Sequence, residues 1–202
     1  MVGLAWLGDP GLFDPRGRRV AVVGGGAVAA DCALSAARGG AVLVELVALE
    51  SLSEMPLTGA ERNALLAAGV HVSGRTRVTA IDAADGAVRA LEVERVRLPD
   101  GAAFHPAAVT PVPGSGHRRT DLDAVVVAIG STPAAGVPGS GVVTAGDLVH
   151  GPSTVVEAVA SGKDAADAVE ALLGGARPPA AGQGFAILAG RRLEPVGLAT
   201  EF

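Results

Sequence analysis

A run of three glycines is the part of this sequence best suited to binding chemistry. The run directly follows the apolar segment 20–23 and directly precedes a helix-like segment of small residues. That context, between a buried strand and a helix, is the one a GxGxxA dinucleotide turn requires. The predicted turn comprises Gly24, Gly25, Gly26, Ala27, Val28 and Ala29. The alternative is a glycine turn in an α/β protein that binds no ligand.

Each position of this turn has a physical task. The first glycine permits a tight bend, the third lets the backbone approach a pyrophosphate, and a small residue at 29 lets helix and strand cross closely. The first N–H groups of the helix and its positive dipole end would then attract the phosphates. The pattern therefore predicts a site for NAD(H) or NADP(H).

A carboxylate about 20 residues beyond the glycines should contact the ribose. Glu45 and Glu50 are the candidates. Glu45 lies inside the apolar run 42–47, whereas Glu50 lies beyond it, where a strand tip meets ligand. A carboxylate at 50 would accept the 2′ and 3′ hydroxyls of NAD(H) and repel a 2′-phosphate. We predict Glu50 as the ribose contact, with a solvated loop carboxylate as the alternative for either residue.

Other reactive residue types are sparse. Cys32 is the only cysteine, which excludes an internal disulfide, a CxxC pair and an iron–sulfur site, so any electrons must reside on a bound cofactor. Cys32 is expected to be a packed core side chain. The four histidines lack metal-ligand spacing, so no metal site is predicted, and no catalytic residue can be assigned. Arg118 and Arg119 are expected to be solvated.

Composition narrows the setting. The chain has 202 residues, of which 49% are apolar, so it can form one medium domain or a domain with a smaller lobe. A net charge of −5 without a basic stripe argues against nucleic acid. No stretch reaches the roughly 20 apolar residues that span a bilayer, and the first residues do not resemble a signal peptide. We expect a soluble, cytoplasmic protein with no membrane partner.

The elements that would hold these residues alternate between strand and helix. Predicted strands cover 20–23, 42–47 and 70–73, and predicted helices cover 27–37 and 59–68. The pattern then changes to two strands, 75–82 and 87–98, joined by a turn at 84–86, which predicts an antiparallel excursion. After a loop at 99–120 come strands at 122–129 and 142–145 and a helix at 152–173, with Thr154 and Glu157 spaced as a capping box.

These elements predict an α/β fold: a Rossmann-like three-layer NAD(P)-binding domain with an antiparallel β excursion and a partial second lobe of the FAD-binding type. The predicted organisation is an irregular lead-in at 1–17, the NAD(P)-binding domain at 18–133, a remnant of an FAD-binding lobe at 134–175, and a linker and tail at 176–202.

Four segments extend the match beyond one turn. The sequence resembles the NAD(P)-binding part of the flavoprotein family that includes the glutamate synthase small subunit and the N-terminal half of dihydropyrimidine dehydrogenase. The segments are VAVVGGGAVAADCA at 20–33, EMP at 54–56, PVPGS with DLDAVVVAIGSTP at 111–133, and TAGDLVHGPSTVVEAVASGKDAADAV at 144–169. They occur in the order found in the family.

The resemblance implies a flavin-dependent oxidoreductase in which NAD(P)H passes hydride to FAD for onward electron transfer. It adds further candidates for cofactor binding: Ala128, Ile129, Gly130, Gly146, Asp147, Thr154 and Val155. In the family the aspartate of the Gly-Asp pair binds the ribityl chain of FAD, and the helix start after it faces the flavin. Helix capping alone would also explain Thr154, and a turn aspartate would explain Asp147.

The departures from the family imply a partner. No FAD fingerprint precedes Arg18, and Ala48, Leu49 and Glu50 stand where the family often has Tyr-Arg-Arg, which favours NADH over NADPH. We therefore predict a subunit or fragment of a flavin-dependent oxidoreductase whose FAD is shared with a partner chain carrying the missing fingerprint domain. The alternative is a non-catalytic dinucleotide sensor or assembly subunit derived from such an enzyme.

Overall fold

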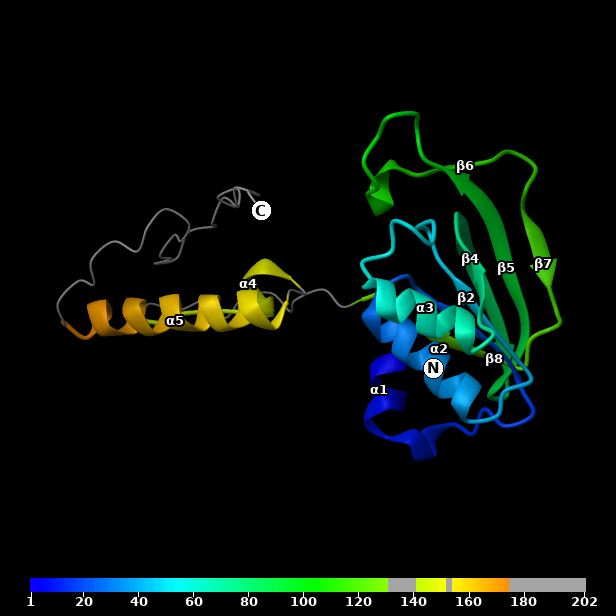
Figure 1. The fold of residues 1–202 in the computed structure, drawn as a ribbon, viewed down its shortest axis with the longest axis horizontal. Coiled ribbons are helices and arrows are strands. Elements are labelled where there is room, and N and C mark those ends of the chain that lie inside the picture. The colour runs from blue at the N-terminus through cyan, green and yellow to red at the C-terminus, as the bar shows by residue number, and fades with distance from the viewer. Residues whose placement is uncertain (131–140, 152–153, 175–202) are drawn as a thin grey trace. The chain divides into compact units, whose positions relative to one another are not determined.

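The computed structural model describes residues 1–130, 141–151 and 154–174. The chain divides into two units, residues 1–130 and 131–202 (Figure 1). Unit 1 holds the glycine turn and Glu50. Unit 2 holds the Gly146–Asp147 pair and the long helix.

A four-stranded parallel sheet forms the centre of unit 1. Its strand order is β3-β2-β1-β8, where β1 is Arg19–Val23, β2 is Leu43–Val47, β3 is His71–Ser73 and β8 is Ala124–Val127. Helices α2 (Ala27–Arg38) and α3 (Gly59–Ala67) provide the crossovers from β1 to β2 and from β2 to β3. The predicted parallel strands and helices of the first 75 residues are confirmed, with ends that differ by one or two residues.

An antiparallel sheet follows β3 in the chain. It contains β4 (Thr76–Ala84) and β5 (Ala87–Arg97), joined at the predicted turn, where Asp85 and Gly86 both have positive φ. Two short strands, β6 (Thr110–Pro111) and β7 (His117–Arg119), also pair with β5. The prediction of a loop over the whole of 99–120 was therefore wrong. Strands of two or three residues have too little periodicity to be visible, and they form here because β5 offers them hydrogen-bonding partners.

The two faces of the parallel sheet bury different layers. Alternate residues of β1, Val20 and Val22, pack with the helices, whereas Ala21 packs with Leu91 and Val93 of β5. Figure 1 shows the helices and the antiparallel strands on opposite sides of the sheet. Because side chains alternate along a strand, one buried run such as VAVV serves both cores. The predicted three-layer α/β architecture with an antiparallel excursion is confirmed.

The first residues are not an irregular lead-in, contrary to prediction. Residues Gly3–Gly8 form helix α1 and Pro10–Leu12 form a 3₁₀ turn, η1. Trp6 is buried, its ring meets Phe13 edge-on at 5.5 Å, and its indole N–H donates to the carbonyl of Phe13 at 3.1 Å. Val2 also forms a parallel bridge with Val127 at the edge of β8. These contacts join residues far apart in sequence, which local periodicity does not reveal.

Unit 2 has two helices in its described part, α4 (Asp147–His150) and α5 (Val155–Leu172). The predicted capping box is confirmed: the Thr154 hydroxyl accepts from the backbone N–H of Glu157, whose carboxylate accepts from the N–H of Thr154. The strand predicted at 142–145 is wrong, since those residues have no regular structure. A strand is stabilised by a neighbour, and none pairs with this segment in the described part of the chain.

Candidate functional site at the carboxyl edge of the sheet

Three predicted site segments leave the parallel sheet at the same edge. Val23 at the end of β1 is level with Val47 on β2 and Val127 on β8. The N–H of Gly24 donates to the carbonyl of Val47 at 2.9 Å, and the N–H of Ala128 donates to that of Val23 at 2.8 Å. Ligands of open α/β sheets bind outside the carboxyl ends of the strands, which is where these segments meet.

Gly24 makes the closest approach in the site. Its φ is +136°, and a Cβ built there would lie 2.2 Å from the carbonyl oxygen of Ala128. Both the backbone angle and the contact exclude any side chain. The first glycine of the pattern therefore lets β1 turn into α2 directly beside the segment that follows β8.

Gly25 lies against the predicted ribose contact. A Cβ at Gly25 would lie 2.6 Å from Oε2 of Glu50 and 2.8 Å from its Cδ. The carboxylate of Glu50 thus rests on the bare backbone of the glycine turn, although 25 positions separate the two residues. This is the position expected of a carboxylate that contacts a nucleotide bound at the turn.

Gly26 is the N-cap of α2 and faces open space. A Cβ at this position would meet no atom within 4 Å, and no side chain caps the helix. The first N–H groups of a helix have no partner within it, so those of Ala27 and Val28 are suited to receive an anion. Ala29 is fully buried in the core between helix and sheet, which explains the small residue at that position.

The segment after β8 contributes a different surface. Ala128 is buried, Ile129 is 73% exposed, and Gly130 has a φ of +89°. An apolar side chain so exposed at the carboxyl edge could pack on a flat ring bound there. The structure therefore brings together the glycine turn, Glu50 and the segment 128–130 within unit 1.

Glu45 has a structural task instead. Its carboxylate accepts from the hydroxyl of Ser73 at 2.5 Å and pairs with the guanidinium of Arg119, which also binds Asp121 at 2.8 Å. Arg119 was expected to be solvated, and that was wrong, because its side chain is 20% exposed and ties β7 to β2. Hydrogen bonds from Arg119 hold the pKa of Asp121 below its ordinary value. Of the two candidate carboxylates, Glu50 is therefore the one that lies at the glycine turn.

The sequence did not reveal a set of hydrogen bonds from Arg75 that holds the segment on either side of Glu50. Arg75 has a φ of +52°, donates from Nη2 to Glu54 at 2.6 Å and from Nη1 to the carbonyl of Leu49 at 3.3 Å. Hydrogen bonds from Ser51 and from Arg75 lower the pKa of Glu54. The only local signal was the match of Glu54-Met55-Pro56 to the family, and that match gave no role for Glu54.

The remaining candidates lie in unit 2. Gly146 has a φ of +63° and donates its N–H to the hydroxyl of Ser161 on α5 at 2.8 Å. That bond fixes the Gly146–Asp147 turn to the helix that begins with Val155. Val155 is 81% exposed, and the Thr154 hydroxyl is already used as the helix cap. The Gly146–Asp147 turn is thus bonded to α5 at Ser161, and Thr154 and Val155 stand at the start of the same helix.

Cys32 lies in the core, as predicted. Its side chain is buried among α1, α2 and the sheet, and a Cβ at Gly3 would lie 2.8 Å from its Sγ. Burial, and to a smaller degree the charge of Asp31, raise the pKa of the thiol to about 11. Thiolate chemistry at this position is therefore suppressed. Across the described ranges, no cluster of metal-ligand side chains occurs.

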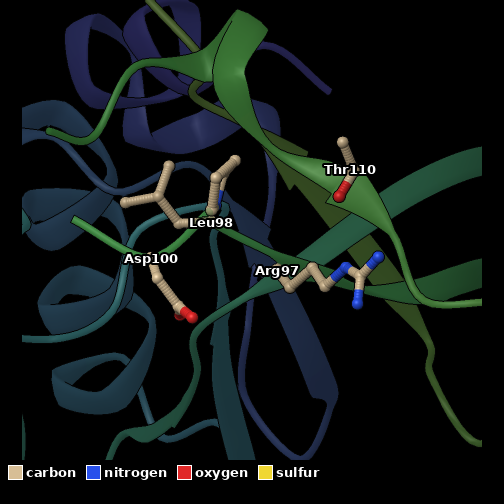
Figure 2. A pocket seen from close by; sticks show the side chains of 5 residues that line it. Arg97, Leu98, Asp100 and Thr110 are labelled. Carbon is tan, nitrogen blue, oxygen red and sulfur yellow. The ribbon is translucent and has the colours of Figure 1, made fainter. Parts of the chain in front are cut away.

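A separate pocket of about 340 Å³ lies on the antiparallel layer (Figure 2). Its lining consists of Arg97, Leu98, Pro99, Asp100 and Thr110. Figure 2 shows Thr110 on β6 near Arg97 at the end of β5, with Leu98 and Asp100 on the turn that follows. None of the predicted site residues lines this pocket, so the glycine turn remains the candidate site.

A parallel sheet whose first strand runs through a glycine turn into a helix defines a Rossmann-type α/β domain. The chain belongs to the pyridine nucleotide-disulphide oxidoreductase family, whose model matches residues 8–142. This membership confirms the family resemblance seen in the sequence. No helix in the described ranges is long and apolar enough to cross a membrane.

Two curated proteins are similar to this chain in sequence. The chain is 36% identical over 181 residues to the NADP(+)-dependent formate dehydrogenase subunit beta of Moorella thermoacetica, covering 78% of this chain and 25% of that protein. It is 32% identical over 192 residues to a putative glutamate synthase [NADPH] small chain of Cereibacter sphaeroides, covering 80% and 44%. The chain thus spans less than half the length of these curated relatives.

Among solved structures, the thioredoxin reductase of T. acidophilum is similar, with a TM-score of 0.47 and 18% identity, over 63% of this chain and 35% of that one.

Proposed function

We propose that this chain is the NAD(P)H-binding subunit or fragment of a flavin-dependent oxidoreductase. It would bind the dinucleotide at the glycine turn and present its nicotinamide for hydride transfer to FAD, from which electrons pass to a partner. The observation that carries the proposal is the position of the Glu50 carboxylate on the bare backbone of Gly25, beside the uncapped start of α2.

The residues present fit a dinucleotide. Gly24 excludes a side chain where the backbone bends, and Gly26 leaves the space before α2 open. The N–H groups at the start of α2 would bind the pyrophosphate, helped by the helix dipole. Val28, at the first turn of α2, and Ile129, after β8, would line the sides of the bound cofactor.

NADH is the preferred dinucleotide in this proposal. Glu50 stands where a cation would serve a 2′-phosphate, and a carboxylate accepts the ribose hydroxyls while repelling phosphate. Leu49 and Ala48 add no cation. The relatives named above carry NADP(+) or NADPH in their names, so this preference would set the chain apart from them.

The flavin side of the proposal rests on unit 2. FAD supplies an acceptor for hydride, and this transfer needs positioning more than proton transfer. Gly146 and Asp147 would contribute part of its site, together with Thr154 and Val155 at the start of α5. A partner chain would supply the rest, and the exposed apolar side chains on α5, among them Val156 and Leu172, offer a surface for it.

The test is a cofactor titration of the full chain, alone and co-expressed with the products of neighbouring genes. We expect NADH to bind the isolated chain more tightly than NADPH, and flavin absorbance to appear only with a partner. Failure of both nucleotides to bind would overturn the proposal. NADH binding without flavin in either sample would instead support a non-catalytic sensor or assembly subunit.

A charge reversal tests the ribose contact separately. Glu50→Arg should shift the preference towards NADPH, since a guanidinium pairs with a 2′-phosphate. Asp100→Arg, at an exposed position of the turn after β5 in the same unit, controls for the change in net charge. An unchanged preference in Glu50→Arg would remove Glu50 from the site.

A further inference from the structure

We propose that Arg75 is a positioning residue that sets the choice between NADH and NADPH by holding Glu50 in place. The inference rests on the proposed function, since it concerns the same nucleotide site. It is carried by a set of contacts that we name the Arg75 clamp, formed by Arg75, Glu54 and Ser51.

The clamp closes both ends of the segment that carries Glu50. At the near end, Arg75 donates from its backbone N–H to the carbonyl of Glu50 at 3.2 Å and from Nη1 to that of Leu49 at 3.3 Å. At the far end, its Nη2 donates to Oε1 of Glu54 at 2.6 Å. One side chain thus bridges the start and the end of the segment 49–54.

Glu54 completes the closure. Its other oxygen, Oε2, accepts from the backbone N–H of Ser51 at 2.9 Å and from the Ser51 hydroxyl at 2.5 Å. Ser51, the residue after Glu50, is therefore bonded to the carboxylate of Glu54. That carboxylate in turn binds the guanidinium of Arg75, which also binds the carbonyl of Leu49. Charge-assisted bonds of this kind are stronger than neutral ones, and the Arg75 and Glu54 side chains are only 22% and 27% exposed.

The backbone under the segment is equally specific. A Cβ at Gly74 would lie 2.7 Å from the carbonyl oxygen of Glu50 and 3.2 Å from the Cα of Ser51. The residue after it, Arg75, has a φ of +52°, an uncommon conformation for a side-chain-bearing residue. The guanidinium also lies 5.6 Å from the ring centroid of Phe104. A strained backbone angle at a well-braced position is typical of a functional constraint.

The consequence for binding is selective. A free segment 49–54 would have to be ordered whenever Glu50 contacts a ribose, and that ordering weakens binding. Removing the clamp should lower the affinity for NADH, which uses Glu50, more than the affinity for NADPH, which Glu50 repels. A residue that merely stabilised the fold would weaken both nucleotides alike and leave their ratio unchanged.

The experiment compares dissociation constants of NADH and NADPH for the full chain by calorimetry. Arg75→Asn removes the guanidinium while keeping a residue that tolerates a positive φ. We expect its NADH-to-NADPH preference to narrow by about threefold to tenfold. Arg118→Asn is the control, because it likewise removes a guanidinium that pairs with carboxylates, here those of Asp82 and Glu92 on the antiparallel layer.

A double-variant cycle decides whether Arg75 acts through Glu50. In a Glu50→Gln background, Arg75→Asn should change the preference no further, since coupled residues are not additive. Full additivity, or an unchanged preference in Arg75→Asn while wild-type protein binds NADH, would overturn the inference and leave the proposed function standing. Wild-type protein that binds neither nucleotide would overturn the proposed function itself.

Discussion

The carboxylate of Glu50 lies against the Cα of Gly25. A Cβ on Gly25 would be only 2.6 Å from Oε2 of Glu50. The second position of a GxGxxA pattern has no fixed residue type. In this chain a glycine is needed there because the space that a side chain would fill is taken by the carboxylate of Glu50. The turn and the acid that follows β2 therefore depend on each other.

Gly25→Ala tests that dependence. The new methyl group should displace the Glu50 carboxylate, which is the end of a flexible side chain, so we expect the fold to survive. The affinity for NADH should fall by about tenfold as the ribose contact is lost. Calorimetry gives the affinity and urea denaturation gives the stability. Unchanged NADH affinity would show that the Glu50 position does not matter for binding.

Gly24 and Gly26 should respond to alanine in opposite ways. Gly24→Ala places a Cβ 2.2 Å from the Ala128 carbonyl oxygen at a φ of +136°. The free energy of unfolding should therefore fall by at least about 2 kcal/mol. Gly26→Ala meets no atom within 4 Å and should change stability by no more than about 1 kcal/mol. It should nevertheless abolish NADH binding, because the methyl group would fill the space of the pyrophosphate.

Urea denaturation of the two variants separates folding from binding. A stable Gly26→Ala protein that still binds NADH would place the pyrophosphate elsewhere.

Arg119→Ala should destabilise unit 1. The change leaves Glu45, whose side chain is 11% exposed, without its cation between the sheet and β7. Breaking such a pair typically costs several kcal/mol, and partial exposure of Arg119 reduces this to about 2–3 kcal/mol. Denaturant unfolding measures the loss, with Arg89→Ala, whose pair with Asp85 is exposed, as the control. Equal stability of the two variants would contradict a structural task for Glu45.

Cys32 should resist alkylation in the folded chain. With its pKa raised to about 11 by burial, the thiol stays protonated at neutral pH, and the thiolate is the reactive form. Iodoacetamide at pH 7.5 should label the protein only after denaturant is added. The labelled fraction, measured by intact mass, checks this. Rapid labelling of native protein would mean that α1 opens away from α2.

The Arg75 clamp should weaken in acid. Because the pKa of Glu54 is lowered in the folded chain, its ionised form stabilises the fold above the ordinary pKa of glutamate, about 4.3, and this contribution is lost as the pH falls through the folded value. The denaturant midpoint of wild-type protein should therefore exceed that of Glu54→Gln near pH 6, and the difference should shrink below about pH 4. A difference independent of pH would exclude Glu54 as the titrating group.

The sequence predicted the parallel half of unit 1 well because local signals define it. Apolar runs, the glycine turn and the helix ends at Gly39 and Gly69 are all read within a few residues. The antiparallel hairpin was also visible, since Asp85 and Gly86 mark its turn. The position of Glu50 beside the glycine turn was predictable, because its distance in sequence from the glycines reflects the geometry of one crossover.

The missed features depend on contacts between distant segments. Trp6 is buried because α1 packs on α2, and nothing near position 6 indicates that partner. Arg119 finds Glu45 across 74 positions, and Arg75 reaches Glu54 across 21. Charged residues in a Gly-Pro loop read as solvated unless the opposing carboxylate is known. Pairings of this kind are a property of the tertiary fold and not of any local pattern.

The burial of Trp6 also gives the molecule a built-in optical probe. The chain has one tryptophan and no tyrosine. Fluorescence excited at the tryptophan band therefore comes from Trp6 and reports on the packing of α1 against α2. Unfolding of unit 1 would move that emission to longer wavelength, because the indole would pass from the core into water. Reduced nicotinamide absorbs where tryptophan emits, so quenching of the same signal would report NADH arriving at the sheet edge.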